Sequence, residues 1–138
     1  MRETRLYRVD PRGLDDIWLD VYPFIDKAAD YSDGKYSTGD VLYLLKKGDM
    51  QLWVAYNDQT ICSACVTQVY DYPKARRLFV QFCGGFDIES WLFHLKTLMQ
   101  WGHDNNCKHV EIAGRKGWVK KLKRFGFKEI HNVVSCAI

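Results

Sequence analysis

The sequence contains no long apolar run and lacks the residue patterns that build disulfide or metal scaffolds. No stretch approaches the roughly 20 apolar residues that a membrane-spanning helix needs. The first five residues do not lead into the apolar core of a secretory signal peptide. The five cysteines are an odd number, and they include one CxxC pair but no second pair with zinc spacing. We therefore expect a cytoplasmic protein with reduced thiols, no bound metal and no membrane contact.

The remaining composition is that of an ordinary globular protein. Of the 138 residues, 47% are apolar, 27% are charged and 14% are aromatic. A chain of this length buries roughly two thirds of its unfolded surface, so it needs no covalent support. We expect a single domain over residues 1–138, with either a bulky aromatic core or a sticky aromatic surface.

The charges are unevenly distributed although their net value is only +3. The segment 10–40 has eight Asp against three basic residues, a balance of −5, whereas 115–128 has seven Lys or Arg and no acid. The first segment favours cations and the second favours phosphates or acidic proteins, unless both are simply solvated faces. The spacing puts four basic side chains on one face of a short helix: Lys116, Lys120, Lys123 and Arg124. A nucleic-acid partner is not expected.

Apolar periodicity and capping signals predict ten elements in the order β-α-α-β-β-β-α-β-α-β. Asp10-Pro11 starts a helix that Pro23 ends or kinks, and Ser37 with Asp40 forms a capping box for the next helix, which Gly48 ends. Alternation predicts strands at 6–9, 52–56, 60–70, 78–83, 109–113 and 130–138. Asp87 caps a long helix, and a short helix covers 118–125. This order predicts an α+β fold with a mixed, mostly antiparallel sheet and helices on both faces.

The cysteines and histidines suggest little chemistry. Cys62 and Cys65 have the CxxC spacing, but residues i and i+3 of a strand project to opposite faces, which disfavours a shared metal or disulfide. Cys83 is a nucleophile if a histidine approaches it, and otherwise a small buried apolar residue. His94 and His103 fall off the apolar stripe of the long helix, which predicts surface positions.

The junction between a strand and the long helix is the most suggestive local feature. Gly84 and Gly85 stand just before Asp87, where free backbone N–H groups and the helix dipole attract anions. Two alternatives remain open: the glycines bind a phosphate, or they only turn the chain. Asp87 itself would cap the helix and repel a phosphate.

The chain resembles the GNAT superfamily of acyl-CoA-dependent acyltransferases, most strongly from Phe79 to Phe127. The resemblance rests on the succession of strand, glycine loop, long helix, strand and short helix with a closing Gly126-Phe127. It implies that acetyl-CoA lies between the strands at 78–83 and 109–113. It also implies a set of cofactor-binding residues: Gln81, Phe82, Cys83, Gly84, Gly85, Phe86 and Arg115.

The sequence departs from the family pattern at three places. The usual phosphate loop is reduced to Gly84-Gly85 without a basic residue, and Arg115 stands where the family often has Asn. Leu122 occupies the position of the tyrosine that commonly protonates the leaving thiolate, so an active enzyme needs another acid. Acyl transfer also needs a polarised carbonyl and a base. A backbone N–H near Gln81 or Phe82 fits the first need. Glu111 is the first candidate for the base and His109 is the second, unless both side chains lie on a solvated face.

Two functions from different classes follow. The first is an N-acyltransferase that moves an acetyl group from acetyl-CoA to an amine, with the amine attracted by the acidic segment 10–40. The alternative is a catalytically inactive GNAT-like domain that binds a protein partner or has a structural role, with homo-oligomerisation open in both cases. The compact size and the ending also look similar to small GNAT-like proteins of tailed bacteriophages, which implies the host cytoplasm or a virion.

Overall fold

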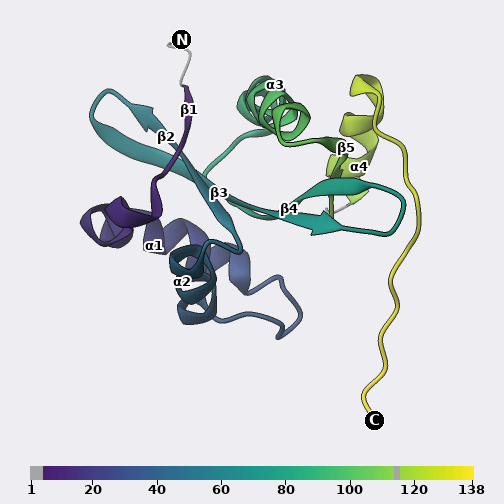
Figure 1. Ribbon diagram of the computed structural model, residues 1–138, viewed down its shortest axis with the longest axis horizontal. Helices are drawn as coiled ribbons and strands as arrows, with labels where there is room; N and C mark the ends of the chain where they lie inside the picture. Colours follow the sequence, from purple (N-terminus) through teal and green to yellow (C-terminus); the bar gives the residue numbers. More distant parts are fainter. Residues whose placement is uncertain (1–4, 114–115) are drawn as a thin grey trace.

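The computed structural model describes residues 5–113 and 116–138, and it has one five-stranded sheet between two layers of helices (Figure 1). The strands are β1 (Leu6–Arg8), β2 (Gln51–Asn57), β3 (Thr60–Asp71), β4 (Arg76–Gly84) and β5 (Cys107–Ile112). The helices are α1 (Leu14–Ala29), α2 (Thr38–Lys47), α3 (Ile88–Asp104) and α4 (Lys116–Leu122), with short 3₁₀ turns at Pro11–Gly13 and Lys123–Phe125. The strands follow in sequence order across the sheet, antiparallel except for the parallel pair β4–β5. The expected α+β fold with a mixed sheet is confirmed.

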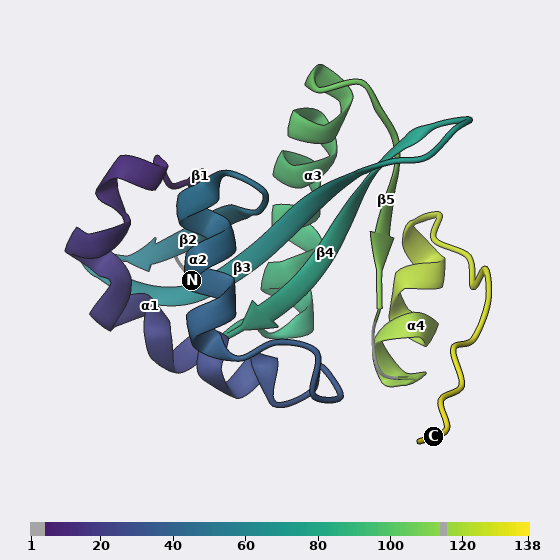
Figure 2. The same cartoon turned by 60° about the horizontal axis from the view of Figure 1, so that its bottom comes forward.

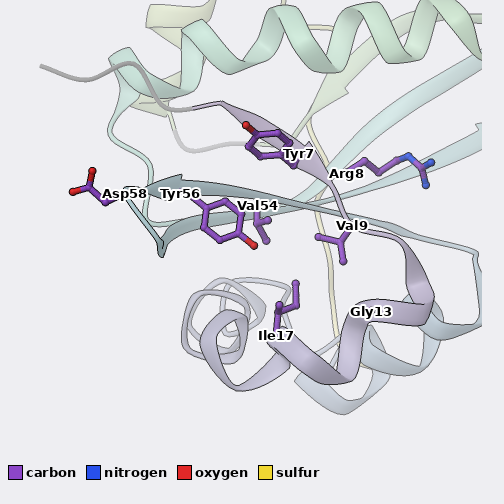
Figure 3. A pocket seen from close by; sticks show the side chains of 8 residues that line it. All are labelled: Tyr7, Arg8, Val9, Gly13, Ile17, Val54, Tyr56 and Asp58. Atoms are coloured by element: carbon purple, nitrogen blue, oxygen red, sulfur yellow. The ribbon is translucent and has the colours of Figure 1, made fainter.

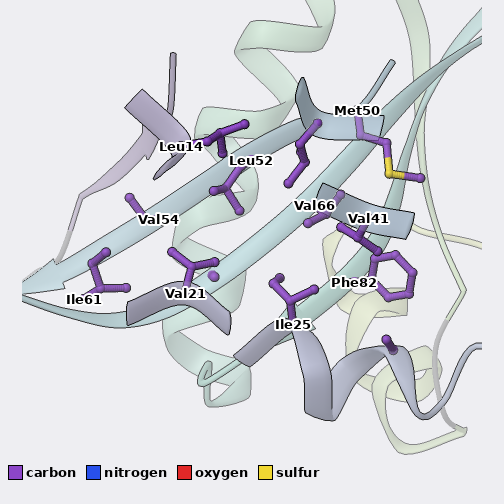
Figure 4. Close-up of a cluster of buried hydrophobic side chains, with 13 residues drawn as sticks. Leu14, Val21, Ile25, Val41, Met50, Leu52, Val54, Ile61, Val66 and Phe82 are labelled. Carbon is purple, nitrogen blue, oxygen red and sulfur yellow. The ribbon is translucent and has the colours of Figure 1, made fainter. Parts of the chain in front are cut away.

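Each face of the sheet carries its own apolar cluster. The first cluster lies under α1 and α2 (Figure 4) and contains Val21, Ile25, Val41, Leu52 and Phe82 among others. The second lies under α3 and α4, and its buried members include Trp53, Leu78, Val80, Trp91, Leu95, Leu98 and Leu122. The sheet is therefore covered on both faces, as alternating apolar side chains in β2, β3 and β4 require.

The capping signals place the helices where the sequence predicts them. The Ser37 hydroxyl accepts from the Asp40 N–H at 3.1 Å, and the Asp40 carboxylate accepts from the Ser37 N–H at 2.9 Å. Gly48 ends α2 in the left-handed conformation with φ 89°. The Asp87 carboxylate caps α3 by accepting from the Ser90 N–H at 2.7 Å. These contacts satisfy backbone groups that a helix end leaves without partners.

Pro23 does not end its helix, which continues to Ala29. Proline removes the hydrogen bond to the carbonyl four residues earlier, here that of Leu19. Leu19 is 88% exposed, so water can satisfy its carbonyl. The expectation that Pro23 ends the helix is therefore wrong, whereas a kink at Pro23 stays a prediction.

The expected last strand at 130–138 is also wrong. After Phe127 the chain runs as an extended segment that pairs with no strand (Figures 1 and 2). Local β-propensity alone does not create a strand, because a strand needs a partner for its backbone groups.

None of the helices among the described residues is both long and apolar enough to span a bilayer. Within the same ranges, no three His, Cys, Asp or Glu side chains come together as a metal site would require.

The two consecutive glycines at the end of β4, Gly84 and Gly85, are explained by the close approach of α1. A Cβ at Gly84 would lie 2.6 Å from the carbonyl oxygen of Phe24. At Gly85, whose φ is +83°, a Cβ would lie 2.5 Å from the carbonyl oxygen of Cys62 and 2.8 Å from the Phe24 ring. Contacts this short are forbidden, so only glycine fits at either position.

We expect Gly85→Ala to lower the free energy of unfolding by at least about 2 kcal/mol, because it combines left-handed strain with a steric clash. Gly34→Ala is the matched control, since Gly34 has φ +76° and no atom within 4 Å of its Cβ position. This control should cost only about 1 kcal/mol. Urea unfolding of both variants measures the difference, and equal losses would refute the close packing.

Candidate functional site

The strands β4 and β5 separate toward their carboxyl ends. Their parallel pairing begins at Arg76 with Cys107 and ends at Val80 with Ile112, whereas β4 continues to Gly84. Figure 2 shows the two strands close together at one end and apart at the other. The structure thus has the separation of β4 from β5 that the sequence resemblance implies, and this part of the sheet is called the β4–β5 opening below.

A β-bulge lies in β4 where this opening begins. Val80 pairs with Thr67 and Phe82 pairs with Val66, so Gln81 is an extra residue opposite the β3 ladder. The last β4–β5 pair is Val80 with Ile112. Gln81 therefore has no paired residue in β3 and none in β5. A bulge interrupts the ladder and redirects backbone groups, and such features are concentrated beside active sites.

Three polar side chains form a cluster around the bulge on the face of the sheet that carries α1 and α2. The Gln81 amide donates to the Tyr70 hydroxyl at 2.7 Å and to the Gln68 side-chain oxygen at 3.0 Å. The Tyr70 hydroxyl in turn donates to the Gln68 oxygen at 3.2 Å. All three side chains are half-buried, so the cluster is held in place yet accessible from outside.

Aromatic rings surround the polar cluster. The Tyr70 ring contacts Phe79 edge-on and stacks on Tyr72, and the loop between α1 and α2 contributes Tyr36 against Phe82 at 5.6 Å. Burial and the neighbouring Tyr36 raise the pKa of Tyr70, an effect that the hydrogen bond from Gln81 opposes. The Tyr70 hydroxyl is therefore a neutral proton donor near pH 7.

The two proposed bases lie on the neighbouring strand β5 with different surroundings. The Glu111 carboxylate is 3.5 Å from the Arg77 guanidinium, and its side chain is 17% exposed. His109 is exposed. The alternation of β5 places both on the sheet face opposite Val110 and Ile112, which pack in the second cluster. Glu111 is the better-positioned group, because Arg77 and partial burial hold it in place.

The residues expected to bind a phosphate have other contacts. Gly84 and Gly85 pack against Phe24, and Asp87 brings a negative charge to the start of α3. Hydrogen bonding from Ser90 lowers the pKa of Asp87, which keeps this carboxylate ionised. Close packing therefore explains why both positions are glycine, and these glycines give no support to the phosphate interpretation. Arg115 lies outside the described residues.

Cys83 and Phe86, the remaining cofactor candidates, pack against the second cluster. Cys83 is opposite Cys65 in the β3–β4 register, and burial together with the neighbouring Cys83 thiol raises the pKa of Cys65 well above its ordinary value. The thiols of Cys65 and Cys83 are therefore mainly part of the apolar core.

The expectation that Cys62 and Cys65 face opposite ways is wrong. Ala55 pairs with Ser63 and Tyr56 pairs with Ile61, so Cys62 is an extra, bulged residue in β3. This bulge brings Cys62 and Cys65 to the same side, against the second cluster. All cysteines of the structure are free thiols.

The predicted surface position of His94 is also wrong, since only 1% of it is exposed. The Phe86 ring lies 5.6 Å from the His94 ring and helps to cover it. Burial lowers the pKa of His94, so it is a neutral member of the α3 layer. His103 is exposed as predicted.

Two cavities lie at the opposite edge of the sheet, beside β1. The larger, of about 540 Å³, is lined by Tyr7, Ile17 and Tyr56 among others (Figure 3), and the smaller, of about 150 Å³, lies between β1 and α2. Neither includes a residue of β4 or β5. The larger one is a wide, shallow depression without converging polar groups, so the chemistry favours the β4–β5 opening.

Comparisons with known proteins bear on the fold of the chain. No protein-family profile matches the sequence, and no curated protein matches it. Among solved structures, a predicted acetyltransferase from Clostridium acetobutylicum, determined with acetyl-CoA, superposes with a TM-score of 0.67 at 15% identity, covering 97% of this chain and 96% of that chain.

Two further solved structures are similar over nearly their whole length. A probable acetyltransferase has a TM-score of 0.70 at 12% identity, covering 97% of both chains. An aminoglycoside acetyltransferase from an uncultured soil metagenomic sample, in complex with sisomicin, has a TM-score of 0.65 at 10% identity, covering 98% of this chain and 97% of that one. The chain therefore has the GNAT fold, which it shares with these acetyltransferases.

Sequence reasoning missed the residues that surround the bulge. Gln68, Tyr70 and Arg77 carry no motif, and only the β3–β4 and β4–β5 registers bring them to Gln81 and Glu111. The one available signal was the alternation of Gln68 and Tyr70 with Val69 in a long strand, which places both polar side chains on one face.

The raised pKa of Tyr70 predicts a pH-dependent stability. Its unfolded form ionises near pH 10, before the folded form, so this contribution is fully present below about pH 10 and is lost as the pH rises further. We expect the free energy of unfolding to fall more steeply above that pH in the wild type than in Tyr70→Phe. Tyr43→Phe, at an exposed site on α2, should follow the wild type. Coincident curves for all three proteins would contradict the buried environment of Tyr70.

Proposed function

We propose that the chain, acting as one domain, is an N-acyltransferase that transfers an acetyl group from acetyl-CoA to an amine. The main support is the opening between β4 and β5, which starts at the Gln81 bulge. Polar side chains from β3, β4 and β5 lie beside it on one face of the sheet. The GNAT fold supports the proposal, and the similar solved structure determined with acetyl-CoA supports the choice of that co-substrate.

The thioester arm of acetyl-CoA fits the opening better than its phosphates fit the loop after β4. Beyond Val80 and Ile112 the strands no longer pair, so backbone groups of β4 are available to an extended ligand. At Gly84 and Gly85 the space toward a Cβ is filled by Phe24 and Cys62. We propose that the phosphates instead contact basic residues of α4 and the turn after it, where Lys120, Lys123 and Arg124 are exposed.

The chain supplies a group for each chemical need of acyl transfer. A backbone N–H at Gln81 or Phe82 polarises the thioester carbonyl as negative charge develops on its oxygen. Glu111 takes a proton from the attacking ammonium group, directly or through water, with His109 as the second candidate. Tyr70 donates the proton that the leaving thiolate needs, which replaces the tyrosine that is absent at Leu122.

An amine reaches this face past the acidic segment. The loop between α1 and α2 lies beside the carboxyl end of β4, as the contact of Tyr36 with Phe82 shows. Asp30 and Asp33 in this loop are exposed. Their charges raise the local concentration of a cationic substrate.

Calorimetric titration with acetyl-CoA tests the proposed opening. We expect micromolar binding by the wild type and at least about ten-fold weaker binding by Ala113→Trp, because Ala113 is exposed and follows the last residue of β5. Thr97→Trp, at an exposed position of α3, is the matched control and should bind like the wild type. Absence of heat and of any thermal shift at millimolar acetyl-CoA would overturn the proposal.

Turnover with a panel of primary amines, followed by release of the CoA thiol, tests the base. We expect Glu111→Gln to lower kcat about 100-fold while acetyl-CoA binding is unchanged, because general-base catalysis contributes about that factor. His109→Gln should retain most activity. The reverse order of the two variants would make His109 the base, and equal rates for all three proteins would exclude both.

The inactive alternative is favoured by one observation, the filled and acidic surroundings of Gly84 and Gly85. It predicts that no acetyl-CoA binds, or that it binds without turnover of any amine. The calorimetric titration and the turnover assay above therefore separate this alternative from the enzyme.

A further inference from the structure

Two neighbouring rows of paired residues cross β3, β4 and β5 on the sheet face opposite α3. The rows are Tyr70–Arg77–His109 and Gln68–Phe79–Glu111. Leu78 lies between the two rows on β4 and packs in the second cluster, so the side chains of both rows point to the other face. The β3–β4 hairpin extends past α1 and α2 (Figure 2), and none of these six residues is fully buried. A polar and aromatic surface is therefore accessible from solvent beside the β4–β5 opening.

Arg77 in this surface has hydrogen-bonding capacity that its protein contacts leave unused. Its neighbour Arg76 donates to the Asp71 carboxylate at 2.6 Å and to the Asn105 carbonyl oxygen at 3.0 Å. Arg77 instead has an ionic contact with the Glu111 carboxylate at 3.5 Å, and within the described part of the chain its guanidinium donates no hydrogen bond. A guanidinium has five N–H donors in a planar fork that fits a carboxylate. The Arg77 side chain is 30% exposed, so such a ligand can reach it.

The opposite charges of Arg77 and Glu111 lie side by side, and a substrate with a single charge does not satisfy both. Glu111 attracts the ammonium group of an amine, but Arg77 brings a positive charge to the same place and repels that group. A carboxylate next to the ammonium group removes this repulsion and fills the Arg77 donors. In an α-amino acid both groups are attached to one carbon atom, which suits charged atoms that lie 3.5 Å apart.

We infer that this surface binds a free α-amino acid as the acetyl acceptor, with the carboxylate on Arg77 and the ammonium group on Glu111. The inference rests on the proposed function, since it names the amine that the same site acetylates. The ammonium group keeps the attraction of the acidic loop between α1 and α2. Arg77 adds a contact that selects against amines without a carboxylate.

The aromatic rings of the surface indicate an apolar side chain on the amino acid. Phe79 is paired with Glu111, and the centre of its ring is 6.0 Å from that of Tyr70. Tyr72 stacks on Tyr70 at 6.1 Å, and the hydrogen bond from Gln81 holds the Tyr70 hydroxyl in place. These rings offer a flat apolar surface, so a phenylalanine or leucine side chain gains contact area there.

Acetylation removes the charge that Glu111 recognises. The ammonium group gives one proton to Glu111, which passes it to water, and the nitrogen then forms the amide bond as the thioester C–S bond breaks. The leaving thiolate takes the Tyr70 proton, and a second proton from the nitrogen restores the Tyr70 hydroxyl. The products are an N-acetyl amino acid, CoA and one proton. The product has lost its ammonium group but keeps a carboxylate beside the negative Glu111, which favours its release.

Calorimetric titration with amino acids and their decarboxylated analogues tests the inference. The pairs are L-phenylalanine with phenethylamine and L-leucine with 3-methylbutylamine, each measured with and without CoA. We expect the wild type to bind one or both amino acids about ten-fold or more tightly than the paired amine, because a charge-assisted contact contributes about that factor. Arg77→Gln should abolish this preference without weakening the binding of the amine. Arg76→Gln is the matched control and should keep the preference, because Arg76 already donates to Asp71 and Asn105.

Equal weakening of the amino acid and the amine in Arg77→Gln would mean that Arg77 only holds Glu111 in place, and would overturn the inference. Equal affinities of the wild type for both members of each pair would overturn it as well, as would no heat from either amino acid at millimolar concentration.

Release of the CoA thiol from acetyl-CoA in the same mixtures tests the proposed function separately. Acetyl transfer to amines with no preference for a carboxylate overturns the amino-acid acceptor and leaves the acyltransferase standing. A preference that Arg77→Gln abolishes, without acetyl transfer to any of the four compounds, supports the amino-acid site and contradicts the proposed enzyme.

Discussion

The end of the β4–β5 pairing at Val80 and Ile112 is the constraint on which the site depends. Up to that pair, β4 is an interior strand with partners on both sides. Beyond it, Gln81 is bulged from the β3 ladder while β5 ends, so one short piece of backbone has neither its regular antiparallel partner nor a parallel one. Buried backbone groups must be paired, and a ligand lying along β4 would satisfy this need.

The packing around the bulge explains why the opening is maintained. Gly84 and Gly85 let α1 approach so closely that Phe24 lies against the end of β4. On the same face, Gln81 is tied to Tyr70 and Gln68 by hydrogen bonds, and Phe82 is fixed by Tyr36. Side chains held by both packing and hydrogen bonding are suited to act on a substrate without reorganisation.

The sequence predicts the parts of this structure that depend on local chemistry. The capping box at Ser37, the cap at Asp87 and the alternation of β2–β4 depend on neighbouring residues, and the structure confirms them. Long-range packing decides the rest. His94 is buried because Phe86 covers it, and Cys62 faces Cys65's side because of a bulge opposite β2.

The candidate site was only half predictable for the same reason. Gln81 and Glu111 follow from the resemblance to the GNAT superfamily, whereas Tyr70 and Arg77 reach them through strand register. The expected strand at 130–138 has the opposite outcome. Its residue pattern is typical of a strand, but no strand of the same chain lies beside it to pair with its backbone.

The most direct test of the central claim is an amide chemical-shift titration of the labelled protein with acetyl-CoA. The account predicts the largest shifts at Gln81, Phe82 and Ala113, around the opening, and little change at Tyr7 and Val54 beside the β1 cavity. Shifts confined to the β1 cavity, or no shifts at millimolar acetyl-CoA, would contradict it.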